Sequence, residues 1–357
     1  MRKIFFTVVC AVITLSMLTK GAGAEEALSL SAKSAVLINA EENSVIYSRN
    51  CNERLPMAST TKIMTALVAL ENCPLDTLIT VDERSVGVEG SSVYLKKGEK
   101  LTLENLLYAL LLQSANDAAT AIAVKVGGSV EGFADMMNKK ASELGLCDTH
   151  FTNPHGLDDE NHYTTALELA KIAAAALKNP QFKKIVSTYK AEIPNDGCQR
   201  ILVNHNRLLR EYDGCIGVKT GFTRRCGRCL VSAASRDGLT LIAVTLSAPD
   251  DWNDHKKMLD YGFSMYETVT LTGESGIIFD VPVAGGEKEY ARVCTDGNIK
   301  ITLPRSDGEI TVTAEMPKFM FAPLKKSTVI GKLCFYRNGE IIKEADLYTV
   351  GDCPARK

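Results

Sequence analysis

The chain has 357 residues, enough for two ordinary domains or one large one, and 45% of them are hydrophobic, so a sizeable core can be buried. Its formal net charge is −2, from 41 Lys and Arg against 43 Asp and Glu. This balance argues against a general nucleic-acid binder, which would carry a basic surplus.

The first 24 residues have the pattern of a secretory signal peptide. Arg2 and Lys3 precede an apolar run from Ile4 to Leu18, and a small-x-small cleavage site follows at residues 22–24. The apolar run is shorter than the ~20 residues that span a bilayer comfortably. We therefore predict cleavage after Ala24 and export of the mature chain, to the cell wall or the outer face of the cytoplasmic membrane. An uncleaved anchor is the alternative.

Strands and helices alternate in blocks along residues 25–275. Apolar runs at Ala35–Ala40 and Val45–Ser48 predict a hairpin. A helix follows over Thr60–Leu70, and two short strand-like runs lie within Val81–Lys97. Thr102 can cap the next helix of a helical cluster. The remaining helices of this cluster are predicted at about 117–127, 130–144 and 166–177, the last of them ended by Asn179-Pro180.

Strands return after about Asp196, at residues 214–219, 229–235 and 239–247, and a last helix is predicted over Asp254–Phe263. Strands first, helices in the middle and strands again predict an antiparallel sheet with helices grouped around it, the α+β class. From about Gly276 only short strands separated by turns appear. We predict a catalytic domain over residues 25–275 and a small, all-β, sandwich-like domain over residues 276–357.

Ten of the eleven cysteines lie beyond the predicted leader, and their pairing cannot be deduced from the sequence. Cys226 and Cys229 have the spacing of a redox or zinc motif. Because no second such pair and no His at ligand spacing accompany them, we interpret them as small buried residues of a strand and turn, and predict no metal site.

A candidate nucleophile lies at the start of the first predicted helix. Ser59 and Lys62 are one helical turn apart, so their side chains share a face. A Ser hydroxyl needs a base, and a Lys can be that base if burial and a nearby cation lower its pKa. Alone, a Ser-x-x-Lys spacing is a weak signal, because a capping Ser beside a solvated Lys has the same pattern.

Two further short motifs follow in chain order. Ser114 could relay a proton to a leaving amine, and the amide of Asn116 could bind a substrate peptide carbonyl. Lys219 and Thr220 could hold a carboxylate, and Gly221 would let a substrate backbone lie against the strand. Each motif is weak by itself.

Together, the order and spacing of the three motifs resemble the set found in β-lactamases and penicillin-binding proteins. The chain resembles most of all a low-molecular-mass penicillin-binding protein of the D-alanyl-D-alanine carboxypeptidase type. The resemblance extends over longer stretches and covers about residues 31–263. These stretches are Leu55–Thr65, Leu111–Ala119, Phe151–Leu157, His162–Ala166 and Gly217–Thr223.

The resemblance implies a serine peptidase that removes the terminal D-alanine from peptidoglycan stem peptides. Lys62 would deprotonate Ser59, whose N–H would form an oxyanion hole with that of Phe222, and Ser114 would pass a proton to the departing D-alanine. Lys219 and Thr220 would bind the terminal carboxylate. The resemblance implies no metal or organic cofactor, and inhibition by β-lactam antibiotics. It gives His155 and His162 no chemical role.

Two rivals share these motifs. A serine β-lactamase of class A would need an additional Glu for deacylation, and no Glu-x-x-Leu-Asn stretch supplies one. A non-catalytic wall-binding protein would not need Ser59 and Lys62 together.

Many relatives end in an amphipathic helix that lies on the membrane. Residues 351–357 are too short for one, so membrane association is doubtful.

Overall fold

A computed structural model of the chain describes residues 28–195, 198–305 and 308–357. The predicted signal peptide, residues 1–24, lies outside the described residues. None of the helices in the described ranges is long and apolar enough to cross a bilayer.

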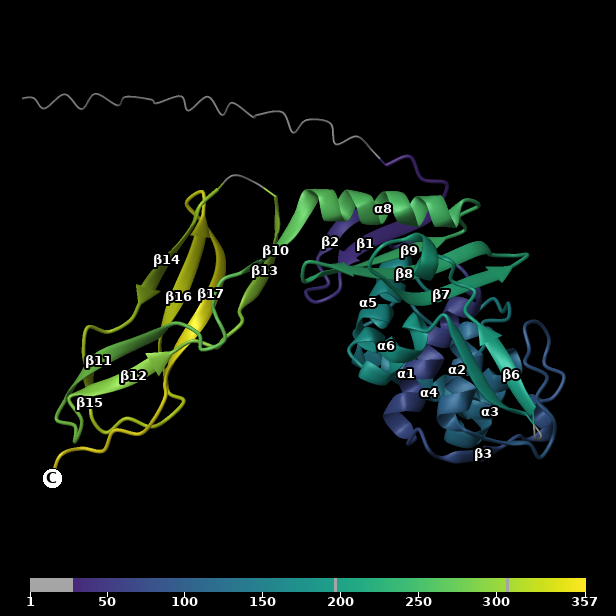
Figure 1. Cartoon of the computed structure of the whole chain (residues 1–357), viewed down its shortest axis with the longest axis horizontal. Helices are drawn as coiled ribbons and strands as arrows, with labels where there is room; N and C mark the ends of the chain where they lie inside the picture. The colour runs from purple at the N-terminus through teal and green to yellow at the C-terminus, as the bar shows by residue number, and fades with distance from the viewer. Residues whose placement is uncertain (1–27, 196–197, 306–307) are drawn as a thin grey trace, which may run out of the picture.

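An antiparallel sheet forms the centre of the first domain, with the strand order β2-β1-β9-β8-β7 (Figure 1). Its strands are β1 (Ser34–Asn39), β2 (Val45–Arg49), β7 (Cys215–Thr223), β8 (Gly227–Arg236) and β9 (Leu239–Leu246). The chain's early and late parts meet where Val36 of β1 pairs with Val244 of β9. Because both faces of the sheet are covered, β1 is buried along its whole length. The strand β7 forms one edge of the sheet.

One face of this sheet packs on α8 (Asp251–Met265) and the other on the helical cluster. The cluster consists of α1 (Lys62–Asn72), α2 (Leu103–Leu112), α3 (Asn116–Gly127), α4 (Val130–Glu143), α5 (Ala166–Leu177) and α6 (Pro180–Ser187). The predicted cap at Thr102 forms, since its hydroxyl accepts a hydrogen bond from the N–H of Asn105. The hydroxyl of Thr165 likewise accepts from the N–H of Glu168 at the start of α5. The expected α+β arrangement is confirmed.

The expectation of two strand-like runs within Val81–Lys97 is wrong. This segment contains the short 3-10 helix η2 (Glu83–Ser85) and an irregular loop, and it is flanked by the short paired strands β3 (Leu78–Thr80) and β4 (Lys100–Thr102). The carboxylate of buried Asp117 accepts hydrogen bonds from the N–H groups of Val93 and Leu95. Backbone N–H groups of this loop are therefore hydrogen-bonded to a side chain, and no neighbouring strand is needed as their partner.

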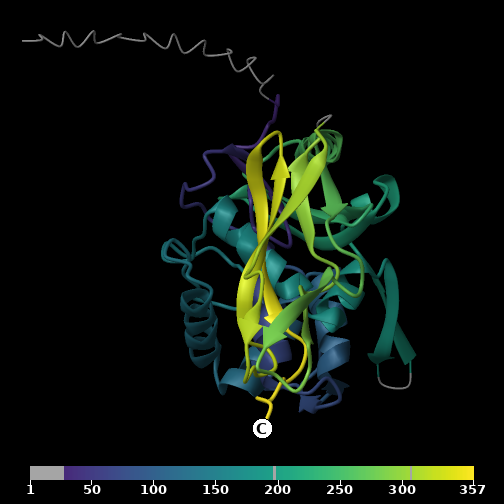
Figure 2. The ribbon, with the colours of Figure 1, turned by 90° about the vertical axis from the view of Figure 1, so that its left-hand side faces the viewer.

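Asn179-Pro180 was expected only to end a helix, and it also begins the next one. The side chain of Asn179 accepts hydrogen bonds from the N–H groups of Gln181 and Phe182, and Pro180 occupies the first turn of α6. Beyond α6 lies a hairpin that was not predicted, β5 (Lys190–Asn195) with β6 (Cys198–Val203), which projects from the domain (Figure 2). The short helix α7 (Leu208–Glu211) leads from it back to β7.

The C-terminal part is all β, as predicted, and lies beyond the end of α8 (Figure 1). One sheet has the order β14-β16-β17-β12-β11-β15, and a second pairs β10 with β13. The strands are β10 (Tyr266–Thr270), β11 (Ile278–Ala284), β12 (Tyr290–Cys294), β13 (Lys300–Pro304), β14 (Ile310–Glu315), β15 (Met320–Phe321), β16 (Val329–Arg337) and β17 (Glu340–Thr349). Asn39 of the first domain donates a hydrogen bond to Thr302 of β13.

Candidate active site

Ser59 lies in a tight turn that leads into α1. The turn is the 3-10 helix η1 (Ala58–Thr61), and Ala58 adopts a positive φ of 47°, which is uncommon for a residue with a side chain. Gly156 packs against this turn: a Cβ added to it would lie 1.9 Å from the carbonyl oxygen of Ala58. Thr65 of α1 also donates to the carbonyl of Pro154, 2.6 Å away. The loop around residues 153–157 therefore supports the conformation of the turn.

Lys62, the first residue of α1, is fully buried beside Ser59. Its Nζ lies 2.8 Å from Ser59 Oγ, 2.7 Å from Asn116 Oδ1 and 2.6 Å from the carbonyl oxygen of His155. Burial, and then the nearby charge of Lys219, holds the pKa of Lys62 well below its usual value. In the neutral amine, two N–H groups can serve the two carbonyl-type oxygens, which leaves the lone pair facing the Ser59 hydroxyl. This arrangement makes Lys62 a suitable base.

Asn116 opens α3, and its side chain already has two partners within the protein. Its Oδ1 accepts from Lys62, and its Nδ2 donates to the carbonyl of Glu89, 2.5 Å away. Gly90 comes so close that an added Cβ would lie 2.7 Å from that Nδ2. Asn116 therefore connects the loop at residues 89–91 with the buried amine of Lys62. The second N–H of the amide makes no hydrogen bond within the described residues.

Ser114 lies in the turn between α2 and α3, with a positive φ of 59°. Its side chain is largely buried and lines the same cavity as Ser59. Within the described residues, its hydroxyl makes no hydrogen bond to Ser59 or Lys62. The structure thus brings Ser114 to the cavity without a direct connection to the Ser59–Lys62 pair.

The edge strand β7 carries the third motif past Ser59. Lys219 is buried, donates to the carbonyl of Thr220 at 2.9 Å, and has its pKa lowered by burial to about 7. Thr220 lines the cavity. A Cβ on Gly221 would lie 3.1 Å from the backbone nitrogen of Ser59, so the strand runs close to that N–H group. Phe222, 64% exposed, lies at the rim.

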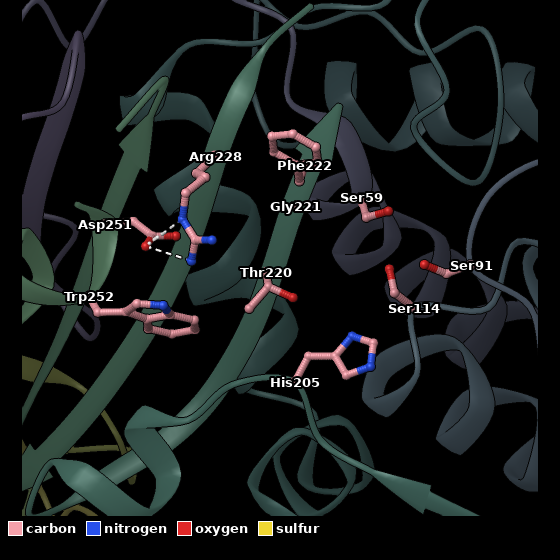
Figure 3. Close-up of a pocket in the computed structure, with 10 residues that line it drawn as sticks. All are labelled: Ser59, Ser91, Ser114, His205, Thr220, Gly221, Phe222, Arg228, Asp251 and Trp252. Carbon is pink, nitrogen blue, oxygen red and sulfur yellow. Dashed lines mark hydrogen bonds and ion pairs between the residues drawn. The ribbon is translucent and has the colours of Figure 1, made fainter. Parts of the chain in front are cut away.

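These side chains surround a cavity of about 320 Å³ (Figure 3). Ser59 and Ser114 lie on one side of it, and Arg228, Asp251 and Trp252 on the other. The cavity is lined by Ser59, Ser91, Ser114, His205, Thr220, Gly221, Phe222, Arg228, Asp251 and Trp252. Lys62, Asn116 and Lys219 are not among these lining residues, but Lys62 bonds to Ser59 and to Asn116, and Lys219 to the carbonyl of Thr220.

Several of these residues were missed by the sequence analysis. Arg228 lies opposite Phe222 in the β7–β8 register, and its Nε and Nη2 are each 2.9 Å from Asp251 Oδ1. The strands predicted at residues 214–219 and 229–235 stop short of Phe222 and Arg228, so the sequence analysis did not place Arg228 beside the third motif. No local sequence pattern marks Asp251 and Trp252 as site residues, because they reach the cavity only through the packing of α8 on the sheet. The same holds for Ser91 and His205, which come from loops.

His155 and His162, to which the resemblance gives no chemical role, make structural contacts. His155 offers its backbone carbonyl, not its ring, to Lys62. The Nδ1 of His162 accepts from the N–H of Thr152, so its Nε2 carries the hydrogen and donates to Thr61 Oγ1, 2.8 Å away. Burial lowers the pKa of His155 to about 3 and that of His162 to about 4.

Comparison with known proteins identifies both domains. The D-alanyl-D-alanine carboxypeptidase family model, peptidase family S11, matches residues 21–250. The model of the C-terminal domain of penicillin-binding protein 5 matches residues 266–354.

Relatives match over nearly the whole chain. D-alanyl-D-alanine carboxypeptidase DacF of Bacillus subtilis is 35% identical over 329 residues, which cover 89% of this chain and 85% of DacF. DacC of Escherichia coli is 32% identical, with 90% of this chain and 84% of DacC covered. The crystal structure of penicillin-binding protein 5 from Haemophilus influenzae has a TM-score of 0.76 at 29% identity and covers 91% of this chain and 98% of its own. The chain therefore belongs to the D-alanyl-D-alanine carboxypeptidase family and is a hydrolase of the penicillin-binding protein class.

Proposed function

We propose that Ser59 attacks the peptide bond between the two D-alanines that end a peptidoglycan stem pentapeptide, with Lys62 as the base. The observation that carries this proposal is the 2.8 Å contact between Ser59 Oγ and the buried Nζ of Lys62. A buried, neutral amine can accept the hydroxyl proton as the Oγ–carbonyl bond forms. The terminal D-alanine then leaves as a free amino acid, and water hydrolyses the acyl-enzyme.

The third motif would position the substrate. The Thr220 hydroxyl faces the cavity and can donate to the terminal carboxylate, while the charge of Lys219 attracts it from behind. Gly221 allows the substrate backbone to lie along β7. The N–H groups of Ser59 and Phe222 would stabilise the oxyanion, a contribution of roughly 3 kcal/mol per donor.

The second motif would complete the reaction. Ser114, on the cavity wall, would pass a proton to the departing amine, and the remaining N–H of Asn116 would donate to a substrate peptide carbonyl. A β-lactam ring presents a strained amide to the same nucleophile, so β-lactam antibiotics should acylate Ser59 and inhibit the enzyme.

The domain boundaries and the location of the protein are part of the proposal. Residues 1–24 would direct export, residues 25–275 would carry the chemistry, and residues 276–357 would form the accessory β domain. Peptidoglycan lies outside the cytoplasmic membrane, so the substrate of the family supports export.

Ser59→Ala tests the nucleophile. The variant should release no D-alanine from a pentapeptide ending in D-Ala-D-Ala and should gain no mass with penicillin, because the attacking oxygen is missing. Ser187→Ala, on the exposed end of α6, is the control and should keep both activities. Penicillin labelling of Ser59→Ala would contradict the assignment. Nitrocefin separates the β-lactamase alternative: a single stoichiometric acylation supports the carboxypeptidase, and rapid turnover supports the alternative.

A further inference from the structure

Two cysteine thiols that the proposed mechanism does not use lie in contact beside the active-site strand. Cys226 ends the turn after β7 and Cys229 lies on β8, with their sulfur atoms 3.9 Å apart. Both are buried, with 3% and 0% exposure. The ten cysteines of the described residues are all free thiols, so this contact joins two reduced sulfurs.

The two thiols have different acidities. The Cys229 thiol donates a hydrogen bond to the sulfur of Cys226, which lowers the pKa of Cys226 and raises that of Cys229. The hydroxyl oxygen of Thr223 lies 3.2 Å from the Cys226 sulfur. Because the thiolate is the reactive form of cysteine, Cys226 is the attacking member of the pair.

The pair touches three segments that shape the candidate active site. Cys229 is the cross-strand partner of Gly221 in the β7–β8 register. Its sulfur lies 3.9 Å from the carbonyl oxygen of Pro56, in the segment that leads to Ser59. The N–H of Cys226 donates to the hydroxyl of Thr223, which itself donates to Asp158 at 2.8 Å. A change at the sulfurs therefore reaches the strand beside Ser59.

We propose that Cys226 and Cys229 form a reversible disulfide, with a low-molecular-mass disulfide as oxidant, and that this bond slows acylation of Ser59. The Cys226 thiolate attacks one sulfur of the oxidant and expels the other as a thiolate. Cys229 then gives up its proton, attacks the Cys226 sulfur and expels the second thiolate. The protein loses two hydrogens, and the oxidant is reduced to two thiols.

The effect on acylation follows from geometry and rests on the proposed function of Ser59. A disulfide requires a sulfur–sulfur distance of about 2.05 Å, far below the present 3.9 Å. Closing that gap pulls the turn at Cys226 toward β8 and moves Thr223 and Phe222, whose N–H is a proposed oxyanion donor. Because misplacement by about 1 Å can cost up to a hundredfold in rate, we expect acylation to slow about tenfold.

The mature chain tests the bond directly. It is equilibrated in glutathione buffers of increasing oxidised fraction, alkylated and digested with trypsin. Cleavage after Arg225, Arg228 and Arg236 separates residues 226–228 from residues 229–236, so only a disulfide can hold these two peptides together. We expect the linked peptide, lighter than the two free thiol peptides by two hydrogens, to appear with oxidation and vanish with dithiothreitol. Its absence at every ratio overturns the proposal.

Acylation by a fluorescent penicillin, measured on the same samples, tests the consequence. The oxidised chain should react about tenfold more slowly, and Cys226→Ser and Cys229→Ser should abolish this dependence. Cys198→Ser, at an exposed cysteine of β6, is the matched control and should keep it. Equal rates for the oxidised and reduced chains, or a dependence that survives in Cys226→Ser, would overturn the proposal. If neither form is labelled, the assignment of Ser59 fails, while the linked peptide still decides whether the disulfide forms.

Discussion

At the scale of single residues, the proposed chemistry depends on keeping Lys62 uncharged inside the protein. A buried ammonium is costly unless its charge is compensated, and a second buried lysine, Lys219, raises that cost for Lys62. The three oxygens around Nζ hold the amine in place, and only one of them belongs to Ser59. Asn116 and the carbonyl of His155 thus orient Lys62 toward Ser59.

Replacing the amine should strongly slow acylation while the fold persists. Lys62→Met keeps a chain of similar length without a base, so acylation by penicillin should slow by about 10²–10⁴-fold. Stopped-flow labelling measures the rate, and the fluorescence of Trp252, the single tryptophan, verifies the folded state. Lys97→Met, at an exposed lysine, should match the unmodified chain. A Lys62→Met rate within a few-fold of the unmodified rate would show that another group takes the proton.

The two buried lysines should give opposite limbs to the pH profile. Acylation should weaken at low pH as Lys62 gains a proton. Capture of a substrate carboxylate should weaken above about pH 7, because the pKa of Lys219 is lowered to about 7 and its charge is lost there. The check is kcat/KM against pH for a peptide ending in D-Ala-D-Ala and for its C-terminal amide. The amide lacks the carboxylate and should lack the alkaline limb. Identical alkaline limbs for both peptides would remove Lys219 from carboxylate binding.

At the scale of elements, two loops position the motifs: the loop around residues 153–157 and the loop at residues 89–95. The sequence analysis assigned this role to neither of them. The motifs themselves could be predicted, because residue type and local spacing carry their chemistry. The contribution of His155 could not, since it offers a backbone carbonyl, which any residue has. Asp117 was seen as a helix start, but its role in holding the loop at Val93 and Leu95 depends on tertiary contact. The hairpin β5–β6 was missed, because its strands are mostly exposed.

The turn that presents Ser59 should be sensitive to Gly156. In Gly156→Ala, the new Cβ would lie 1.9 Å from the carbonyl oxygen of Ala58, and φ is +86°. The backbone must shift, so we expect a loss of at least about 2 kcal/mol in unfolding free energy and slower acylation. Gly128→Ala is the matched control: its φ is +76°, but no atom lies within 4 Å of its added Cβ. It should lose only about 1–2 kcal/mol and keep its acylation rate. Equal effects of the two substitutions would refute the contact argument.

At the scale of the whole molecule, the first domain contains histidines whose burial disfavours the protonated, charged form of the imidazole. Burial lowers the pKa of His155 and of His255 to about 3, and that of His162 to about 4. His255 lies between Ser232 Oγ at 2.5 Å and Thr245 Oγ1 at 2.9 Å, on the face of the sheet covered by α8. These histidines stay neutral in the folded protein across the range in which they would titrate in the unfolded chain.

The first domain should therefore lose stability on mild acidification. Below about pH 6.5 the unfolded chain binds protons at these histidines and the folded protein does not, so the free energy of unfolding falls as the pH drops toward 4. Each such histidine contributes a slope of up to about 1.4 kcal/mol per pH unit. Urea unfolding followed by the fluorescence of Trp252, which lies in this domain, measures the slope between pH 8 and pH 4.5. In His255→Gln one titrating group is gone, so the slope should be shallower, whatever constant difference the substitution leaves at pH 8. An unchanged slope would mean that His255 already takes up its proton in the folded protein, which its two hydroxyl neighbours and complete burial argue against.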